Sequence, residues 1–313
     1  MRINLEYGEA QQNYQLAIAI FIEFGDRYSQ AKTYHQLGMV AQELREYGEA
    51  RQNYQQSLAI YIEFGDRYKQ ASTYGNLGAV ALGLREYEEA KLNYKQAIAI
   101  FDEFNDRYSQ ATSYYQLGNV AQELREYGEA RQNYQQALVI CIEFGDRYSQ
   151  AGTYHQLGRV AQELREYGEA RQNYQQALAI FIEFGDRYSQ ASSYHQLGSV
   201  AEELREYAEA RQNYQQALAI KIEFGDRYSQ ASTYQGLGVV AEQLEEFPEA
   251  KINFLEALNI WLELKDEYMV KTYSIPSLSR IYQATQDQSL LESMAKILGV
   301  TVEDILQVLS SQE

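Results

Sequence analysis

The chain has one cysteine and two prolines among its 313 residues, and it contains no long apolar run. With Cys141 as its single cysteine it cannot form an internal disulfide. The longest apolar stretches, such as LAIAIFI from Leu16, are too short to cross a bilayer. The first residues, MRINLEYGEAQQNYQ, show no basic segment followed by an apolar core. We therefore expect no signal peptide, no membrane association and a cytoplasmic location.

Basic residues are also scarce. Lys and Arg number 27 against 44 Asp and Glu, which gives a net charge of −17. A chain with this charge repels phosphate groups, so nucleic acid and anionic membranes are not expected partners. The segment AKILGVTVEDI is superficially similar to a DNA-reading helix-turn-helix, but its Glu303 and Asp304 argue against that function.

Patterns typical of catalysis or metal binding are missing. No glycine-rich phosphate loop occurs, and no serine or cysteine has a histidine at a spacing suited to nucleophilic attack. His35, His155 and His195 occupy the same position in three separate helical segments, and neighbouring helices lie about 8–10 Å apart. We expect these histidines to make polar contacts at the surface. The sequence thus predicts no enzymatic activity, no cofactor and no metal site.

What the chain does contain is a motif that returns every 40 residues, as in YHQLGMVAQELREYGEARQNYQQSLAI from Tyr34. Apolar residues spaced by three and four predict one helix near residues 27–44 and a second near 48–64, and the pattern then repeats. The segment FGDR supplies a glycine suited to a helix end and an aspartate suited to the next helix start, while REYG makes a short connection. Neither helix can bury its apolar stripe alone, so the pairs must stack.

These helices resemble the tetratricopeptide repeat family. The residues that carry the resemblance are the aromatic, leucine and small positions of the first helix and the small, aromatic and small positions of the second: Tyr34, Leu37, Gly38, Ala50, Tyr54 and Ser57. The match recurs six times. Ile62 stands where the family usually has a proline, so the second helix is longer, which is similar to the repeats of kinesin light chains. The resemblance implies an all-α, right-handed superhelical α-solenoid of helix hairpins that binds proteins or peptides in a concave groove.

The sequence divides into three segments. Residues 1–26 supply only a second helix, and residues 27–266 hold six units. Residues 267–313 form degenerate capping helices. Gly299 separates the last two of them, and Thr301 caps the start of the final one. Because the first segment lacks a partner helix, we expect an exposed apolar face there that is covered by another domain, by end-to-end self-association or by crystal neighbours. That expected face consists of Tyr7, Ala10, Tyr14, Ala17 and Phe21.

The copies differ along one stripe of the first helix. The changing positions lie at offsets 0, 3, 4 and 7 from Lys32, nearly opposite the packing face. In the family that the chain resembles, this stripe lines the groove. The predicted ligand-binding residues are Lys32, His35, Gln36, Met39, Asn76, Tyr115, Gln116, Asn119, His155, Gln156, Arg159, His195, Gln196 and Gln235. Exposed positions of the second helix, such as Glu49, Gln52 and Asn53, change less, which favours a binding surface; neutral drift is the alternative.

An acidic rim lies one turn beyond the stripe and consists of Glu43, Glu123, Glu163 and Glu203. Amide side chains can bond the backbone of an extended peptide, and carboxylates favour lysine or arginine, so the expected partner is a protein or extended peptide with basic residues. Arg159 would either bind a carboxylate or pair with Glu163, four residues further on.

Two functions of different classes agree with these features. Long, nearly identical arrays of this kind resemble those joined to bacterial signalling ATPases or caspase-like proteases, and the chain starts in mid-repeat. The first hypothesis is therefore the recognition or sensor region of a larger bacterial signalling protein. The alternative is a free-standing scaffold or adaptor that assembles a multiprotein complex. A synthetic array is disfavoured by irregular residues such as Lys221 and Cys141, where Cys141 replaces an aromatic residue and is expected to be inert packing.

Overall fold

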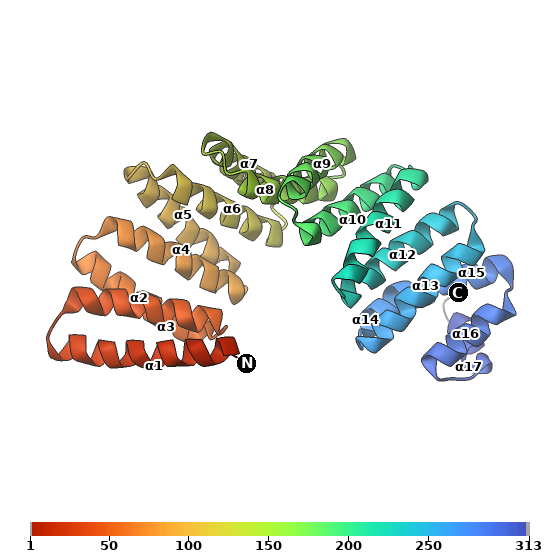
Figure 1. The fold of residues 1–313 in the computed structure, drawn as a ribbon, viewed down its shortest axis with the longest axis horizontal. Helices are drawn as coiled ribbons and strands as arrows, with labels where there is room; N and C mark the ends of the chain where they lie inside the picture. The colour runs from red at the N-terminus through yellow and green to blue at the C-terminus, as the bar shows by residue number, and fades with distance from the viewer. Residues whose placement is uncertain (1, 311–313) are drawn as a thin grey trace. The chain divides into compact units, whose positions relative to one another are not determined.

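The computed structural model describes residues 2–310, and the side chains of residues 7–309. Residues 1 and 311–313, the outer ends of the expected segments 1–26 and 267–313, lie outside this part. Between residues 2 and 310 the chain forms helices and no strand (Figure 1). None of these helices is both long enough and apolar enough to span a membrane. The chain divides into two compact units, Met1–Leu164 and Arg165–Glu313.

The first unit holds eight of the described helices: α1 (Arg2–Glu23), α2 (Arg27–Glu43), α3 (Tyr47–Glu63), α4 (Arg67–Gly83), α5 (Tyr87–Glu103), α6 (Arg107–Glu123), α7 (Tyr127–Glu143) and α8 (Arg147–Glu163). The second unit begins with α9 (Tyr167–Glu183), α10 (Arg187–Glu203), α11 (Tyr207–Glu223), α12 (Arg227–Gln243) and α13 (Phe247–Glu263). It ends with α14 (Glu267–Met269), a π-helical turn (Val270–Ser274), α15 (Ile275–Thr285), α16 (Gln288–Leu298) and α17 (Val302–Ser310). These bounds agree within a few residues with the helices that the periodicity predicts.

Each unit is a solenoid of antiparallel helix pairs. From α1 to α8, and again from α9 to α13, every helix packs against the next one along the chain. The first helices of successive pairs also touch, since α2 contacts α4, α4 contacts α6, and α10 contacts α12. The all-α solenoid of hairpins that the sequence predicts is confirmed.

A buried seam holds the pairs together. Ala41 of α2, Tyr54 of α3 and Leu77 of α4 belong to one apolar cluster, so the second helix is held between two first helices. Equivalent clusters recur along the chain. Gly38 is required at the closest approach, because a Cβ atom there would lie 2.6 Å from the Tyr54 ring. This contact explains why the glycine is the same in all six copies.

The connections also repeat. Gly65 adopts a left-handed φ of 66° at a helix end, and the side chain of Asp66 accepts a hydrogen bond from the Lys69 amide at 3.0 Å. The other oxygen of Asp66 accepts from the Tyr28 hydroxyl at 2.6 Å, which raises the pKa of Tyr28 to about 12 and joins one repeat to the next. Arg45 in the REYG connection also has a positive φ, 61°. The sequence does not indicate this turn, because glycine is the residue that usually adopts it.

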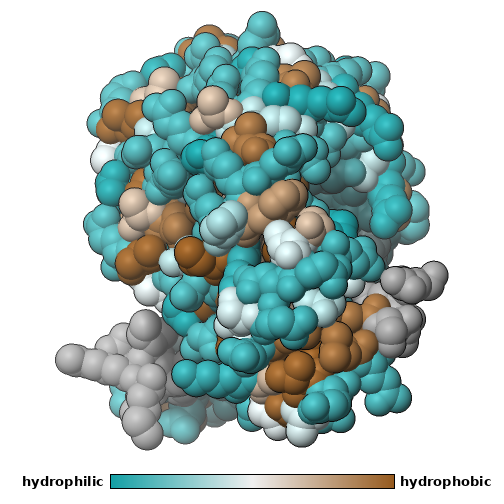
Figure 2. Space-filling model, turned by 90° about the vertical axis from the view of Figure 1, so that its right-hand side faces the viewer, coloured by the Kyte–Doolittle hydropathy of each residue, from teal (hydrophilic) through white to brown (hydrophobic). Residues whose placement is uncertain are grey.

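The C-terminal helices complete the second unit. Leu278, Leu290 and Met294 are buried in one cluster with Trp261 of α13. Gly299 ends α16 with a φ of 70°, and Thr301 and Asp304 bond each other's backbone amides at the start of α17. Figure 2 shows the face at this end of the chain, where brown side chains appear among mostly teal ones.

The N-terminal helix differs from the expectation. Its five predicted residues, Tyr7, Ala10, Tyr14, Ala17 and Phe21, are half-buried rather than exposed, because α2 lies against α1. The apolar side chains that α1 exposes are others. Leu16 is 65% exposed and Ile20 is 51% exposed, whereas Ile60, at the position of Ile20 in the next copy, is 2% exposed.

Candidate functional site

The predicted stripe lies on the first helices of both units. In the first unit it runs over α2, α4, α6 and α8, and in the second over α10 and α12. On α8, Leu157 and Val160 are buried in the seam, whereas Gln156 is half-buried and Arg159 is exposed. One helix therefore presents a packing face and a separate polar face, as the spacing predicts.

The histidines of the stripe are half-buried, so the expected surface position is wrong, although His35 and His195 do make the expected polar contacts. The ring nitrogens of His35 lie 3.2 Å from Thr73 Oγ1 and 3.1 Å from Asn76 Nδ2 on the next first helix. Its ring also packs edge-on against Tyr54. Burial lowers the pKa of His35 and of His155 to about 4, so both rings are neutral near pH 7.

His195 in the second unit follows the same pattern. Its Nδ1 lies 3.1 Å from Thr233 Oγ1, and its ring is tilted against Tyr214. Burial lowers its pKa to about 3. These histidines are short enough to fit between neighbouring first helices and polar enough to bond across them, which accounts for their half-buried position.

Amide side chains make similar links. Gln156 donates to the Tyr115 hydroxyl at 3.3 Å, and in the second unit Gln235 donates to Ser277 at 2.9 Å. Asn119 donates to Gln116 at 3.0 Å within α6. Gln196 is half-buried on α10. This part of the stripe thus ties helix to helix as well as facing outward.

The remaining stripe residues are open to solvent. Lys32, Gln36 and Met39 of α2 are exposed, and the Lys32 ammonium lies 4.7 Å from the centre of the Tyr28 ring. Arg159 donates to Gln156 at 3.2 Å. The alternative that Arg159 pairs with Glu163 is wrong, because no such ion pair forms between residues 2 and 310.

A polar hollow of about 410 Å³ brings several predicted residues together across α4, α6 and α8. Four of its lining residues come from the predicted stripe and rim, namely Asn119, Glu123, Gln156 and Arg159. The other five were not predicted: Leu82, Gly83, Arg85, Tyr87 and Gln122. The residues predicted on α2, α10 and α12 do not line it.

Hydrogen bonds hold three of the rim carboxylates in place. The Tyr87 hydroxyl donates to Glu123 at 3.4 Å, the Tyr127 hydroxyl to Glu163 at 3.1 Å, and the Tyr167 hydroxyl to Glu203 at 3.0 Å. Glu43 is exposed at the same position of α2. Around the hollow, two guanidinium groups face one carboxylate, so the surface there is locally basic in an otherwise acidic chain.

Comparison with protein families agrees with this arrangement. A family model described as the tetratricopeptide repeat matches residues 3–63, 29–103, 109–183 and 185–263. The chain belongs to the tetratricopeptide repeat family. No curated protein matches the sequence.

Solved structures share the fold of this tetratricopeptide array at low sequence identity. The first is a signal transduction ATPase with numerous domains that has a tetratricopeptide repeat sensor, from Pyrococcus horikoshii, at 15% identity and a TM-score of 0.72. That match covers 97% of this chain and 49% of the other. The apo form of RapI matches at 17% identity and 0.65, over 81% and 99% of the two chains. A putative kinesin light chain with nearly identical repeats, from Podosopora anserina, matches at 19% and 0.55, over 64% and 98%.

One of the five hollow residues that were not predicted, Gly83, could have been identified from the sequence. Gly83 occupies the rim position that holds glutamate in Glu43, Glu123, Glu163 and Glu203. The Tyr47 ring occupies the space above it, since a Cβ on Gly83 would lie 2.8 Å from that ring. The replacement of a rim glutamate by glycine was therefore visible in the sequence. Nothing in the sequence indicated Arg85, because its position depends on the left-handed backbone conformation that it adopts, with a φ of 62°.

The second helices give a corrected view of which exposed positions stay constant. The Glu49 position is constant for a structural reason, because its equivalents pair with a cation of the preceding copy, as Glu129 does with Lys91 at 2.6 Å. The Asn53 position is not exposed, since Asn53 is half-buried and Asn133 is buried. A fairer reference is the exposed Gln56 position, which holds glutamine in five copies, glutamate in Glu256 and leucine in Leu16 of α1. Glutamine thus stays nearly constant at this exposed position, whereas the residues of the stripe change from copy to copy.

Between residues 2 and 310, no three His, Cys, Asp or Glu side chains come together in a group that could hold a metal ion. The polar groups of the hollow are instead amides, guanidinium groups and a carboxylate. Such groups suit hydrogen bonding to a polypeptide backbone and to charged side chains.

Proposed function

We propose that this tetratricopeptide array recognises a protein or extended peptide along the first helices. The observation that carries the proposal is the hollow of about 410 Å³ across three successive first helices. Its lining includes Asn119 and Arg159, which belong to the stripe position that holds a different residue in each of the six copies. A surface that served packing alone would favour the same residue in each copy, as the seam does. The proposed binding residues are those of the predicted stripe.

The chemistry of the hollow favours a peptide with charged side chains. Gln156 and Asn119 offer amide groups that can bond a peptide backbone, while Glu123 attracts a lysine or arginine. Arg159 is exposed, and its guanidinium donates to the amide oxygen of Gln156, which leaves its other N–H groups available to an acidic side chain of the same peptide. We therefore propose a ligand of mixed charge, with basic residues directed at the rim.

A peptide library displayed on phage tests this proposal. We expect selection against the whole chain to enrich related sequences, and amide hydrogen exchange with a selected peptide to slow in α4, α6 and α8. Enrichment of no common sequence would contradict the proposal. Protection confined to the second helices, α5 and α7, would place the ligand elsewhere.

We propose further that the array acts as the sensor region of a bacterial signalling protein. The support is its likeness in fold to the solved ATPase whose sensor is a tetratricopeptide repeat. The alternative, a free-standing scaffold in the cytoplasm, has support from the general suitability of these repeats for protein binding. Reading the coding sequence on both sides of the array separates the two: an adjoining catalytic domain supports the sensor, and stop codons on both sides support the scaffold.

Self-association through the N-terminal helix is a second proposal, and it depends on Leu16 and Ile20. These residues lie four apart, hence on one face of α1, and both are more than half exposed. Leu16 stands where the inner copies carry glutamine, as in Gln56. The apolar pair is therefore suited to cover the same pair of a second copy.

Sedimentation velocity over a range of concentrations tests the association. We expect the unmodified chain to associate and the double variant Leu16→Gln, Ile20→Gln to remain monomeric. The matched control is Ile62→Gln, which removes an exposed apolar side chain from α3. Monomers at every concentration in the unmodified chain would refute this proposal.

A further inference from the structure

The second helices share an aromatic position that two copies lack. Rings at this position pack against the tyrosine near the start of the preceding first helix. The centroids of Tyr61 and Tyr28 are 6.0 Å apart, and those of Trp261 and Tyr228 are 4.9 Å apart. Across the chain the position holds Phe21, Tyr61, Phe101, Cys141, Phe181, Lys221 and Trp261. In α7 the ring is replaced by the short side chain of Cys141.

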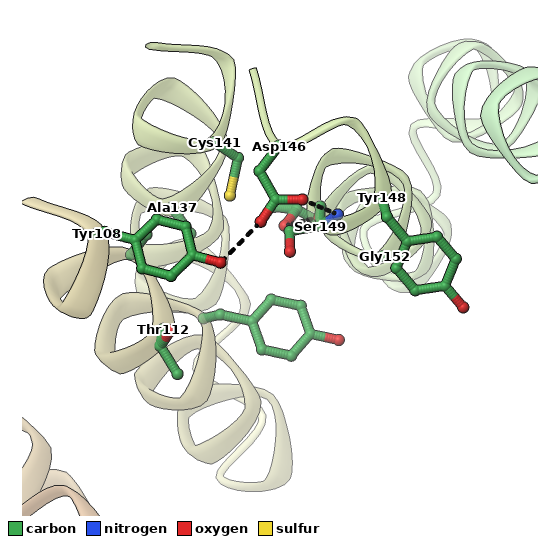
Figure 3. Close-up of a pocket in the computed structure, with 11 residues that line it drawn as sticks. Tyr108, Thr112, Ala137, Cys141, Asp146, Tyr148, Ser149 and Gly152 are labelled. Atoms are coloured by element: carbon green, nitrogen blue, oxygen red, sulfur yellow. Dashed lines mark hydrogen bonds between the residues drawn. The ribbon is translucent and has the colours of Figure 1, made fainter. Parts of the chain in front are cut away.

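The missing ring leaves a pocket of about 250 Å³ between α6, α7 and α8. In Figure 3 the sulfur of Cys141 points into the space between Tyr108 on one side and Gly152 on the other. Gly152 lines the same space, and a Cβ atom added to it would meet nothing within 4 Å. The other copies carry a side chain at that position: Lys32, Ser72, Thr112, Ser192 and Ser232. Two small residues thus coincide in one copy.

The lining of the pocket suits an aromatic ring without negative charge. Tyr108, Tyr148 and Ala137 supply apolar surface. Asp146 supplies a carboxylate that accepts hydrogen bonds from the Tyr108 hydroxyl at 3.2 Å and the Ser149 amide at 3.0 Å, as the dashed lines in Figure 3 show. This carboxylate repels an anionic ligand. An apolar cavity of about 150 Å³ is known to accept benzene, so the space here is enough for one ring with a substituent.

We propose that this pocket binds one aromatic ring, namely the Phe, Tyr or Trp side chain of the peptide held on the first helices. The inference rests on the proposed peptide-binding function. Its link to that function is the position of Thr112, Tyr115 and Gly152, which line the pocket and also belong to the changing stripe. The partner's ring takes the place that Phe101 and Phe181 fill in neighbouring copies.

Two variants of Cys141 test the pocket in the whole chain. Cys141→Phe restores the residue of the neighbouring copies and fills the space, whereas Cys141→Ala keeps the space open. With 4-methylphenol as the probe, we expect calorimetry to detect binding to the unmodified chain and to Cys141→Ala, and roughly a tenfold or greater loss in Cys141→Phe. The anionic probe 4-methylbenzoate, which carries a carboxylate in place of the hydroxyl, should bind neither the unmodified chain nor Cys141→Ala. Gly152→Thr narrows the pocket from the opposite helix and should weaken binding of 4-methylphenol if Cys141→Phe does not fold.

Cys141 also serves as its own reporter, since it is the only cysteine. We expect 4-methylphenol to slow the reaction of its thiol with a disulfide reagent, and 4-methylbenzoate to leave the rate unchanged. Equal binding of 4-methylphenol to the unmodified chain and to Cys141→Phe would overturn the proposal that this pocket binds an aromatic ring. So would the absence of any binding at the solubility limit of the probe.

Peptides selected from the displayed library distinguish the pocket from the proposed function. An aromatic residue in the selected sequence, with affinity lost in Cys141→Phe, supports both. If selected peptides bind Cys141→Phe as well as the unmodified chain, the pocket inference is overturned and the peptide-binding function stands. If 4-methylphenol binds but no peptide is selected, the ligand is a free aromatic molecule and the assignment to a peptide side chain is overturned.

Discussion

Helix α8 presents two faces that the repeat treats differently. Leu157 and Val160 lie on the buried face and are the same in all six copies, whereas His155 and Arg159 lie on the other face and change. The changing face is itself divided, because His155 is half-buried between helices while Arg159 is open to solvent. On this helix the constant residues are therefore the closely packed ones, and change occurs both at the half-buried His155 and at the open surface.

The largest effect should come from breaking the buried face. Leu157→Asp places a carboxylate in a cluster with Ala121, Tyr134 and Val160 and removes apolar burial. We expect a loss of roughly 5 kcal/mol in the free energy of unfolding, measured by chemical denaturation. The matched control is Arg159→Asp on the other face, for which we expect a change within about 0.5 kcal/mol. Comparable losses in the two variants would contradict the division into faces.

A second test concerns Lys221, which occupies the aromatic position of α11. Its side chain is 6% exposed, and its ammonium donates to Thr233 Oγ1 at 2.7 Å. Burial lowers its pKa from 10.5 to about 8. Because the folded state holds the proton less tightly than the unfolded state, folding is penalised fully below about pH 8, and the penalty disappears as the pH rises past 10.5.

Lys221→Phe should therefore stabilise the chain in a pH-dependent way. The lowered pKa of Lys221 corresponds to a loss of about 3 kcal/mol in the free energy of unfolding at pH 7 and of about half of that at pH 9.5. Chemical denaturation at the two pH values gives the difference in unfolding free energy between the variant and the unmodified chain. Because the tyrosines titrate in both proteins, their contribution cancels in this difference. A gain that is the same at both pH values would show that the protonation of Lys221 does not contribute.

A smaller effect is expected where a copy departs from the pattern around a buried tyrosine. The Tyr54 hydroxyl donates to Gln42, and that of Tyr134 donates to Gln122. At the equivalent place Leu82 replaces the glutamine, and the buried Tyr94 hydroxyl has no partner among residues 2–310. Leu82→Gln should supply one and stabilise the chain by about 1 kcal/mol. Tyr94→Phe provides the control, because in that background Leu82→Gln should give no gain.

The helices and their caps were predictable because they depend on local periodicity. The spacing of Tyr34, Leu37 and Ala41 fixes the packing face, and Asp66 with Gly65 fixes the connection. The left-handed turn at Arg45 was not predictable, because no residue type marks it.

The candidate site was predicted only in part, because burial between helices depends on distances that spacing does not supply. His35 and Tyr14 were placed correctly on their helices but assigned the wrong exposure. The pocket beside Cys141 results from missing volume, which becomes visible only when the neighbouring helices are in place.

The central claim is that the hollow across α4, α6 and α8 binds the ligand while the second helices do not. The most direct test is the affinity of a library-selected peptide for two triple variants of the whole chain. One variant changes the hollow, by Glu123→Ala, Gln156→Ala and Arg159→Ala, and the other changes exposed positions of the second helices, by Gln96→Ala, Gln135→Ala and Gln136→Ala.

We expect the hollow variant to lose roughly tenfold or more in affinity, because interface anchors carry most of the binding energy. The second-helix variant should bind as the unmodified chain does, and both should retain melting temperatures close to it. Equal losses in the two variants, or a loss only in the second-helix variant, would contradict the claim.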